Sequence, residues 1–213
     1  MGSLRADWWE TDYAKGDVAI HMTGGGQGKD HPSRLWLVSY IPENSKVLDI
    51  GCCNALMYQT FKDAGKDINY TGVDRLPEFI KYCKDTYSPE ARFYTSDADD
   101  LRDFDDSSFD YVVSRHVIEH LPYYSQHVIE MFRVAKKEVI IVGFLEFTGT
   151  DLDKIQWGMI EQGGSWYNRY SRTGLEAFLK YNVTENFEII ENYKDSGNSI
   201  IIIRKETLKK ELP

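Results

Sequence analysis

The chain has 213 residues, a formal net charge of −9 at pH 7 and a sequence pI near 5.1. This acidic balance argues against a broad surface for nucleic acid or for anionic membranes, so nucleic acid is not an expected partner. No apolar run approaches the length of a membrane span and the amino terminus is not a basic-then-apolar signal, so we expect no membrane contact. The three cysteines, two of them adjacent at Cys52 and Cys53, resemble neither a disulfide framework nor zinc knuckles, and we expect a cytoplasmic protein.

Residues 1–45 precede the first clear strand and are expected to form a lid or helical segment. They contain Trp8–Trp9, a glycine-rich stretch at 23–28 and a predicted helix from Pro32 to Tyr40. The glycine run lacks the Gly-Lys-Ser/Thr ending of a Walker loop. It is therefore either a mobile linker or a hinge that lets the tryptophan segment close over a ligand.

A strand, a tight turn and a helix follow in that order. The apolar run Lys46–Ile50 carries the acid Asp49, turns at Gly51 and opens into a helical pattern at Leu56. This order is typical of the first half of a nucleotide-binding βαβ unit. A helix N-terminus presents unpaired N–H groups and Asp49 adds a negative charge, so the turn suits a ligand with both an anionic and a cationic group. Cys53 stands where such turns usually have glycine, and we expect the turn to shift slightly while still presenting its N–H groups.

Strands and helices continue to alternate up to residue 143. Apolar runs predict further strands at 68–73, 92–96, 109–114 and 138–143, and helical spacing predicts helices from Pro77 onward and over 123–135. An acid, Asp74, ends the second strand, where a carboxylate can hold a ribose diol. The alternation predicts an α/β domain with a doubly wound, mostly parallel sheet.

The last third departs from this alternation. Residues 146–170 read as an aromatic-rich insertion or cap, and Thr173–Glu176 has the spacing of a capping box that begins a helix. Two strands at 187–193 and 199–204 flank a turn and predict an antiparallel hairpin, so that 171–205 forms a closing helix and hairpin. The prediction is a Rossmann-like seven-stranded sheet with an antiparallel last strand and helices on both faces, in one domain over 1–213.

The order of the motifs resembles a class I S-adenosylmethionine-dependent methyltransferase of the small-molecule type. The matching segments lie within 46–145, which this resemblance makes the cofactor-binding core, and are Val47–Cys52, Gly72–Asp74, Ser96–Leu101, Phe109–Asp110 and Val117–Leu121. The closing hairpin also resembles the reversed last strand of that family.

The resemblance implies a role for individual residues. Asp49 and the backbone of Gly51 to Cys53 would face the methionine end of S-adenosylmethionine, and Ser114 and Arg115 would line the region around its sulfur. Asp74 would accept hydrogen bonds from the ribose hydroxyls. Asp97, with the backbone of Ala98, would bind the adenine amino edge. The expected product of the cofactor is S-adenosylhomocysteine.

Two histidines are candidate general bases for an acceptor that must lose a proton. His116 and His120 are four residues apart, so they share a face if the stretch is helical, and they follow a strand at its carboxyl end. A neutral imidazole can take a proton near pH 7. The Glu119–Leu121 run is common in the family that the chain resembles, which implies a packing or helix-start role for His120. His116 is closer to Ser114 and is the preferred base.

Several alternatives to a small-molecule methyltransferase remain open. His116, Glu119 and His120 also spell H-x-x-E-H, a zinc signature that needs a third ligand and a long helix, and we predict no metal site. A metal-assisted RNA 2′-O-methyltransferase and a non-catalytic S-adenosylmethionine-binding module are the alternatives. A nicotinamide dehydrogenase would need glycine where the chain has Cys53 and Leu56.

The expected acceptor is a small molecule: a sugar, an aromatic compound or another metabolite with a hydroxyl or amine. The aromatic-rich segments 8–36 and 146–170 would offer stacking faces, or would simply roof a hydrophobic lid. Arg169 and Arg172 could hold a phosphate or carboxylate on such an acceptor.

Overall fold

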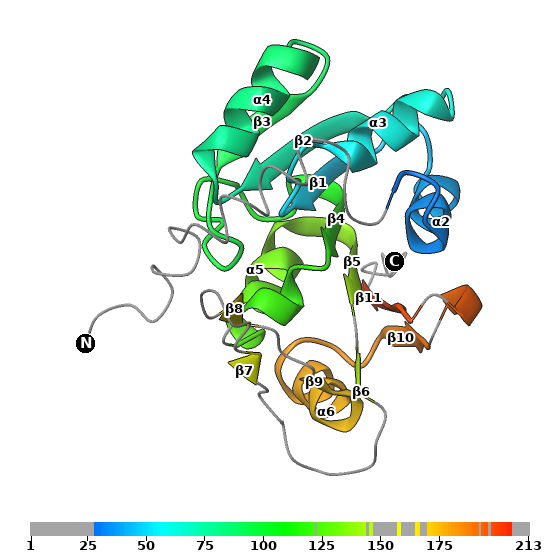
Figure 1. Cartoon of the computed structure of the whole chain (residues 1–213). Coiled ribbons are helices and arrows are strands. Elements are labelled where there is room, and N and C mark those ends of the chain that lie inside the picture. The colour runs from blue at the N-terminus through cyan, green and yellow to red at the C-terminus, as the bar shows by residue number, and fades with distance from the viewer. Residues whose placement is uncertain are drawn as a thin grey trace, which may run out of the picture.

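The computed structural model of the chain describes residues 28–121, 123–143, 145–146, 157–158, 165–166, 170–191, 193–195 and 197–205. Its centre is a seven-stranded sheet in the order β10-β11-β5-β4-β1-β2-β3 (Figure 1). The strands are β1 (Lys46–Ile50), β2 (Asn69–Asp74), β3 (Arg92–Thr95), β4 (Phe109–Arg115), β5 (Ala135–Gly143), β10 (Phe187–Ile190) and β11 (Ser199–Arg204). Strands β1 to β5 pair in parallel, whereas β11 lies antiparallel between β5 and β10. The predicted fold class is confirmed.

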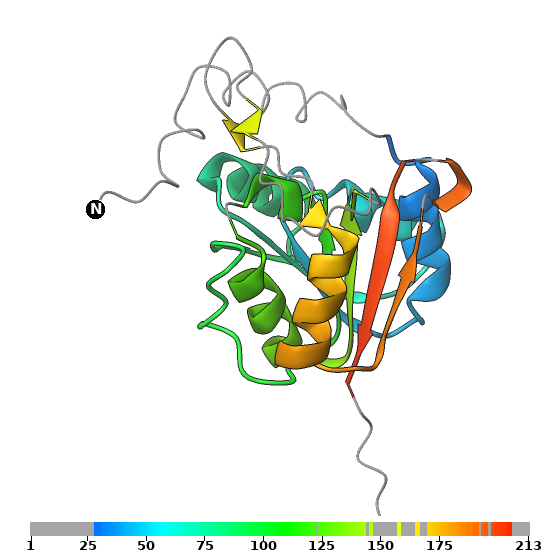
Figure 2. The same ribbon diagram turned by 90° about the horizontal axis from the view of Figure 1, so that it is seen from below.

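Helices cover both faces of this sheet because alternate side chains of each strand point to opposite sides. The described helices of one face are α2 (Pro32–Tyr40), α3 (Leu56–Asp63) and α4 (Pro77–Tyr87), and those of the other are α5 (Ser125–Val134) and α6 (Arg172–Asn182). Val47 packs in the core on the α2–α3 face, and the next residue, Leu48, packs on the α5–α6 face. Seen from below, α5 and α6 lie on the opposite side of the strands from α2 (Figure 2).

Two helix starts show how local sequence sets the elements. Pro32 occupies the first turn of α2, and the N-cap His31 accepts a hydrogen bond from the Ser33 backbone through Nδ1 at 3.3 Å. The predicted capping box at Thr173–Glu176 is wrong. The N-cap of α6 is Ser171, whose Oγ accepts from the Gly174 N–H at 3.3 Å, because Ser171 lies three residues before that donor.

The closing antiparallel hairpin forms as predicted. Its first strand is shorter than expected, and the connection between the two strands contains a 3-10 turn. The 3-10 turn η2 (Tyr193–Asp195) follows β10, and β11 then inserts beside β5. A second 3-10 turn, η1 (Ile118–His120), follows β4. The remaining described elements are two short strand pairs, β6 (Leu145–Glu146) with β9 (Tyr170–Ser171) and β7 (Trp157–Gly158) with β8 (Ser165–Trp166).

Several predictions lie outside the described residues. These are the Trp8–Trp9 segment, nearly all of the glycine stretch at 23–28, most of the aromatic-rich segment 146–170, and Arg169. Among the helices that are described, none is long and apolar enough to cross a membrane.

Candidate active site

The turn after β1 is joined to the end of β2 by backbone hydrogen bonds. The N–H groups of Gly51 and Cys52 both donate to the Val73 carbonyl, at 2.8 and 3.0 Å. The Cys53 N–H donates to Asp74 Oδ2 at 3.0 Å. We expected the turn to present these groups to a ligand, and the structure instead uses all three within the protein. Asp74 is therefore a structural anchor of the turn as well as a candidate ligand-binding acid.

The turn keeps a left-handed backbone despite its departures from glycine. Gly51, Cys53 and Ala55 have φ angles of +71°, +47° and +57°. A side chain in this region costs roughly 1 kcal/mol per residue relative to glycine. The Cys53 carbonyl is held in turn by the buried Cys83, whose thiol donates to it at 3.1 Å. These contacts hold an unfavourable backbone conformation next to the site.

A buried charge cluster lies at the carboxyl ends of β1 and β4. Asp49 is 4% exposed and accepts a hydrogen bond from the Tyr70 hydroxyl at 2.5 Å. Burial raises the pKa of Asp49 to about 6, although the Tyr70 hydrogen bond and the charges of Arg34 and Arg115 oppose this rise. Burial and, next to it, the charge of the nearby Arg34 guanidinium lower the pKa of Arg115 to about 9. One buried carboxylate beside two guanidiniums can hold a zwitterionic amino-acid group.

Arg115 and Ser114 point to opposite faces of the sheet, although both were predicted to line one region. Both lie within β4 rather than past its end, and strand alternation separates them. Arg115 faces α2, where its Nε donates to Ser33 Oγ at 3.3 Å. Ser114 is fully buried on the α5 face, with its Oγ 2.9 Å from Nε2 of His127.

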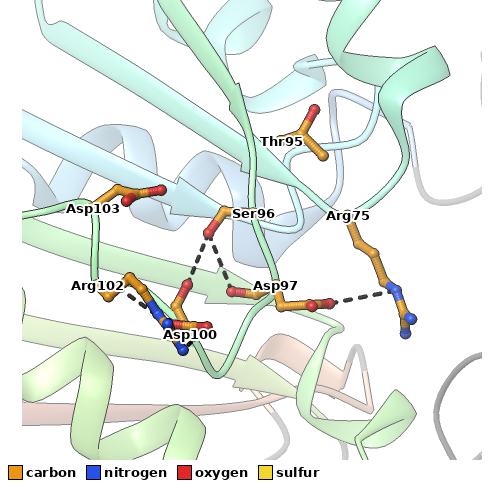
Figure 3. Close-up of a pocket in the computed structure, with 7 residues that line it drawn as sticks. All are labelled: Arg75, Thr95, Ser96, Asp97, Asp100, Arg102 and Asp103. Atoms are coloured by element: carbon orange, nitrogen blue, oxygen red, sulfur yellow. Dashed lines mark hydrogen bonds and ion pairs between the residues drawn. The ribbon is translucent and has the colours of Figure 1, made fainter. Parts of the chain in front are cut away.

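A pocket of about 270 Å³ opens where β2 and β3 end. Figure 3 shows its lining residues, which are Arg75, Thr95, Ser96, Asp97, Asp100, Arg102 and Asp103. Asp97 Oδ1 lies 3.4 Å from Nε of Arg75, and the Asp97 side chain is 51% exposed. The predicted adenine-binding acid is thus accessible and already beside a cation.

His116 belongs to a polar network beside the charge cluster. Its Nδ1 lies 2.9 Å from Oε1 of Glu119, which is 1% exposed, and its Nε2 lies 3.1 Å from Oδ1 of Asn198. Ser33 Oγ donates to the same Asn198 oxygen at 3.0 Å. The network therefore joins the end of β4, η1, the start of α2 and the residue before β11.

The two candidate bases do not share a helical face. His116 follows β4 with a φ of +55°, and His120 ends the 3-10 turn η1, so the helix that would align them is absent from this stretch. His120 donates its backbone N–H to Val117 at 2.9 Å, as a turn residue does. In the part of the chain that the structure describes, no three His, Cys, Asp or Glu side chains are grouped so that they could hold a metal ion.

Three residues of the site were missed by the sequence reasoning. Arg34 and Asn198 come from elements distant in sequence, and nothing local marks them. His127 sits on a helix whose apolar pattern predicts only packing. For Ser114 a signal existed, because the period of two along β4 already places it on the opposite face from Arg115.

Comparisons with known proteins agree with this fold. Residues 48–143 match the sequence family model of a methyltransferase domain. The fold resembles the putative methyltransferase in complex with the Trm112 methyltransferase activator of Haloferax volcanii, at 16% identity and a TM-score of 0.68 over 96% of this chain and 99% of that one. A comparison with curated proteins finds no match.

Two further structures share the fold. Magnesium protoporphyrin IX methyltransferase (ChlM) from Synechocystis PCC 6803, with bound SAH, has 16% identity and a TM-score of 0.65, over 93% of this chain and 97% of that chain. The [4+2]-cyclase SpnF has 14% identity and a TM-score of 0.69, over 90% and 93% of the two chains.

Residues 48–143 match a methyltransferase domain, and the sheet has the fold of S-adenosylmethionine-dependent methyltransferases. The predicted enzyme type and the predicted cofactor, S-adenosylmethionine, are confirmed.

Proposed function

We propose that this methyltransferase transfers the methyl group to a hydroxyl or amine of a small-molecule acceptor, with His116 as the general base. The observation that carries the proposal is the position of His116. It follows Arg115 directly, beside the Asp49 cluster, and its ring is held between Glu119 and Asn198. The net charge of −9 supports a small molecule rather than RNA as acceptor.

Residues of this site would contact each part of the cofactor. Asp49 would pair with the ammonium of its amino-acid end, and Arg34 and Arg115 would pair with the carboxylate. Asp74 would accept from the ribose hydroxyls, and Asp97 with the Ala98 backbone would bind the adenine edge. The cofactor supplies an activated methyl group, so the protein mainly has to orient the acceptor.

The network around His116 can stabilise a proton taken from the acceptor. In the neutral ring, Nδ1–H donates to Glu119. The Nε2 lone pair can act as the base once the Asn198 oxygen, which only accepts, has moved away from it. When Nε2 gains a proton, it can donate to the Asn198 oxygen. The buried carboxylate of Glu119 then faces the imidazolium, as the acid does in a catalytic triad.

Calorimetry and product analysis test the function. We expect S-adenosylmethionine and S-adenosylhomocysteine to bind in the micromolar range, on the order of −8 kcal/mol. A panel of sugars, phenols and amines should contain an acceptor that yields S-adenosylhomocysteine. No heat of binding from folded protein would refute the cofactor placement. Methyl transfer to RNA in place of small molecules would refute the acceptor class, and binding without any transfer would favour the non-catalytic module.

The histidine roles can be separated by turnover. We expect His116→Ala to lower kcat by about 100-fold, because general bases contribute roughly 10²–10⁴-fold. His120→Ala should change kcat by less than about threefold, since the base is assigned to His116. Turnover that survives both substitutions would remove histidine base catalysis from the mechanism.

Cofactor affinity should depend on pH through Asp49. The folded-state pKa of about 6 lies above the ordinary 3.8, so the buried carboxyl is neutral below about pH 6 and loses its attraction for an ammonium. Below about pH 6, the affinity for S-adenosylhomocysteine should fall with decreasing pH, and the decrease should approach tenfold per pH unit. The raised pKa also means that Asp49 favours folding below pH 3.8 and that this contribution is lost as pH rises through about 6.

The Asp49→Asn variant is the matched control for this pH profile. It retains an oxygen that can accept from Tyr70 and removes the titrating charge. Titration calorimetry between pH 5 and 8 should give a flat, weak affinity for the variant. A wild-type profile as flat as that of the variant would contradict the assignment of Asp49 to the ammonium.

A further inference from the structure

Helix α5 holds the acidic loop after β3 through three side chains on one of its faces. His127, Glu130 and Arg133 are spaced three residues apart, so they lie along one side of the helix. Glu130 Oε2 accepts from the Leu101 N–H at 3.0 Å, and Arg133 donates to the carbonyls of Leu101 and Phe104 at 2.8 and 2.9 Å. The backbone of the loop is therefore bound to α5 at successive points.

His127 is the contact of this series that reaches the site. It is fully buried, with Nδ1 2.7 Å from the Ala98 carbonyl and Nε2 2.9 Å from Ser114 Oγ. A carbonyl only accepts, so Nδ1 must carry the hydrogen. Burial lowers the pKa of His127 and so favours the neutral ring, in which Nε2 accepts a hydrogen bond from the Ser114 hydroxyl. His127 thus donates to the Ala98 carbonyl through Nδ1 and accepts from the Ser114 hydroxyl through Nε2.

The loop that His127 holds is also fixed at its other side. The Ser96 N–H donates to the Asp74 carbonyl at 3.0 Å, and Ser96 Oγ donates to the Asp100 carbonyl at 2.9 Å. Figure 3 shows the Ser96 contacts beside Asp97 in the pocket. The backbone around Asp97 is thus tied to β2 through Ser96 and to β4 through His127 and Ser114.

We propose that His127 is a positioning residue for adenine recognition: through the Ala98 carbonyl it sets the conformation of the Asp97–Ala98 backbone that reads the adenine amino edge. The inference rests on the cofactor placement under the proposed function. It assigns the specificity of the adenine loop to a side chain that touches neither cofactor nor acceptor, and it gives the buried Ser114 hydroxyl the role of orienting the ring.

The test compares two ligands that differ only at the base. S-inosylhomocysteine replaces the adenine amino group with an oxygen, so the ratio of its Kd to that of S-adenosylhomocysteine measures recognition of the amino edge. In the wild type we expect a ratio of at least about ten, because the adenine amino group would donate to a charged acceptor and the oxygen of the analogue cannot. In His127→Gln, whose amide can reach Ser114 but not Ala98, the ratio should fall by about fivefold.

Matched variants separate positioning from stability. His127→Asn places an amide donor near the former Nδ1 and should keep the ratio within about twofold. Met131→Ala opens a cavity beside the same helix but leaves His127, Glu130 and Arg133 in place, so it should lower the melting temperature and leave the ratio unchanged. Ser114→Ala removes the hydrogen bond to the His127 ring and should lower the ratio of the two Kd values partly. This variant still tests the role of His127 if His127→Gln does not fold.

The outcomes are distinguishable. A wild-type ratio retained in both His127→Gln and Ser114→Ala overturns the role of His127. So does an equal loss in Met131→Ala, which would make the effect one of stability. A wild type that binds neither ligand overturns the cofactor placement itself, and the inference with it.

Discussion

Replacing Asp74 with alanine is expected to weaken S-adenosylhomocysteine binding by about 100-fold in titration calorimetry. Two charge-assisted hydrogen bonds to the ribose would be lost, and together they contribute roughly 3 kcal/mol. The structure adds a second reason. Asp74 also accepts from the backbone N–H groups of Cys53 and Leu76, at 3.0 and 2.9 Å, so the variant releases the turn that follows β1.

Two further variants make the Asp74 experiment decisive. Asp74→Asn retains one acceptor oxygen and should bind with intermediate affinity. Asp85→Ala removes an exposed acid on α4 that pairs with Lys81, and it should leave the affinity unchanged. An unchanged affinity in Asp74→Ala would show that the ribose lies elsewhere.

The second large effect is expected for Gly51→Ala, which should lower the free energy of unfolding by roughly 2–4 kcal/mol. Gly51 has a φ of +71°, where an alanine side chain is strained. An added Cβ would also lie 2.4 Å from Cγ2 of Val117, so the residues between β4 and η1 would have to move. Urea unfolding measures the loss.

Gly65→Ala isolates the backbone part of this cost. Gly65 has a similar φ of +66° but no atom within 4 Å of the added Cβ, so its substitution should cost about 1 kcal/mol. The double variant Gly51→Ala/Val117→Ala removes the obstructing side chain and should be less destabilised than the sum of its single changes. Equal losses in Gly51→Ala and Gly65→Ala would show that the contact with Val117 has no energetic weight.

The order of the elements could be predicted because each is encoded locally. β1 and α2 occupy the residues expected for them, since a short apolar run and a helix that begins with proline and ends before Pro42 leave little choice. The start of α6 was misplaced because two serine or threonine residues compete for the cap, and Ser171 makes the bond to Gly174.

Side-chain direction at the site was harder to predict. Ser114 and Arg115 are adjacent in sequence, yet the pleat of β4 sends one to α5 and the other to α2. His116 and His120 were expected to share a helical face. Instead, His116 has a left-handed backbone where β4 ends, and its ring lies between Glu119 and Asn198.

The sequence alone determined the class of fold, the resemblance to methyltransferases and the position of acids at the strand ends, because periodicity and strand-end motifs are local features. The tertiary structure decided which of these residues meet. It placed Arg34 beside Asp49, joined Asp74 to the β1 turn and connected Ala98 to Ser114 through His127. Such contacts depend on packing between elements far apart in the chain, and no local pattern encodes them.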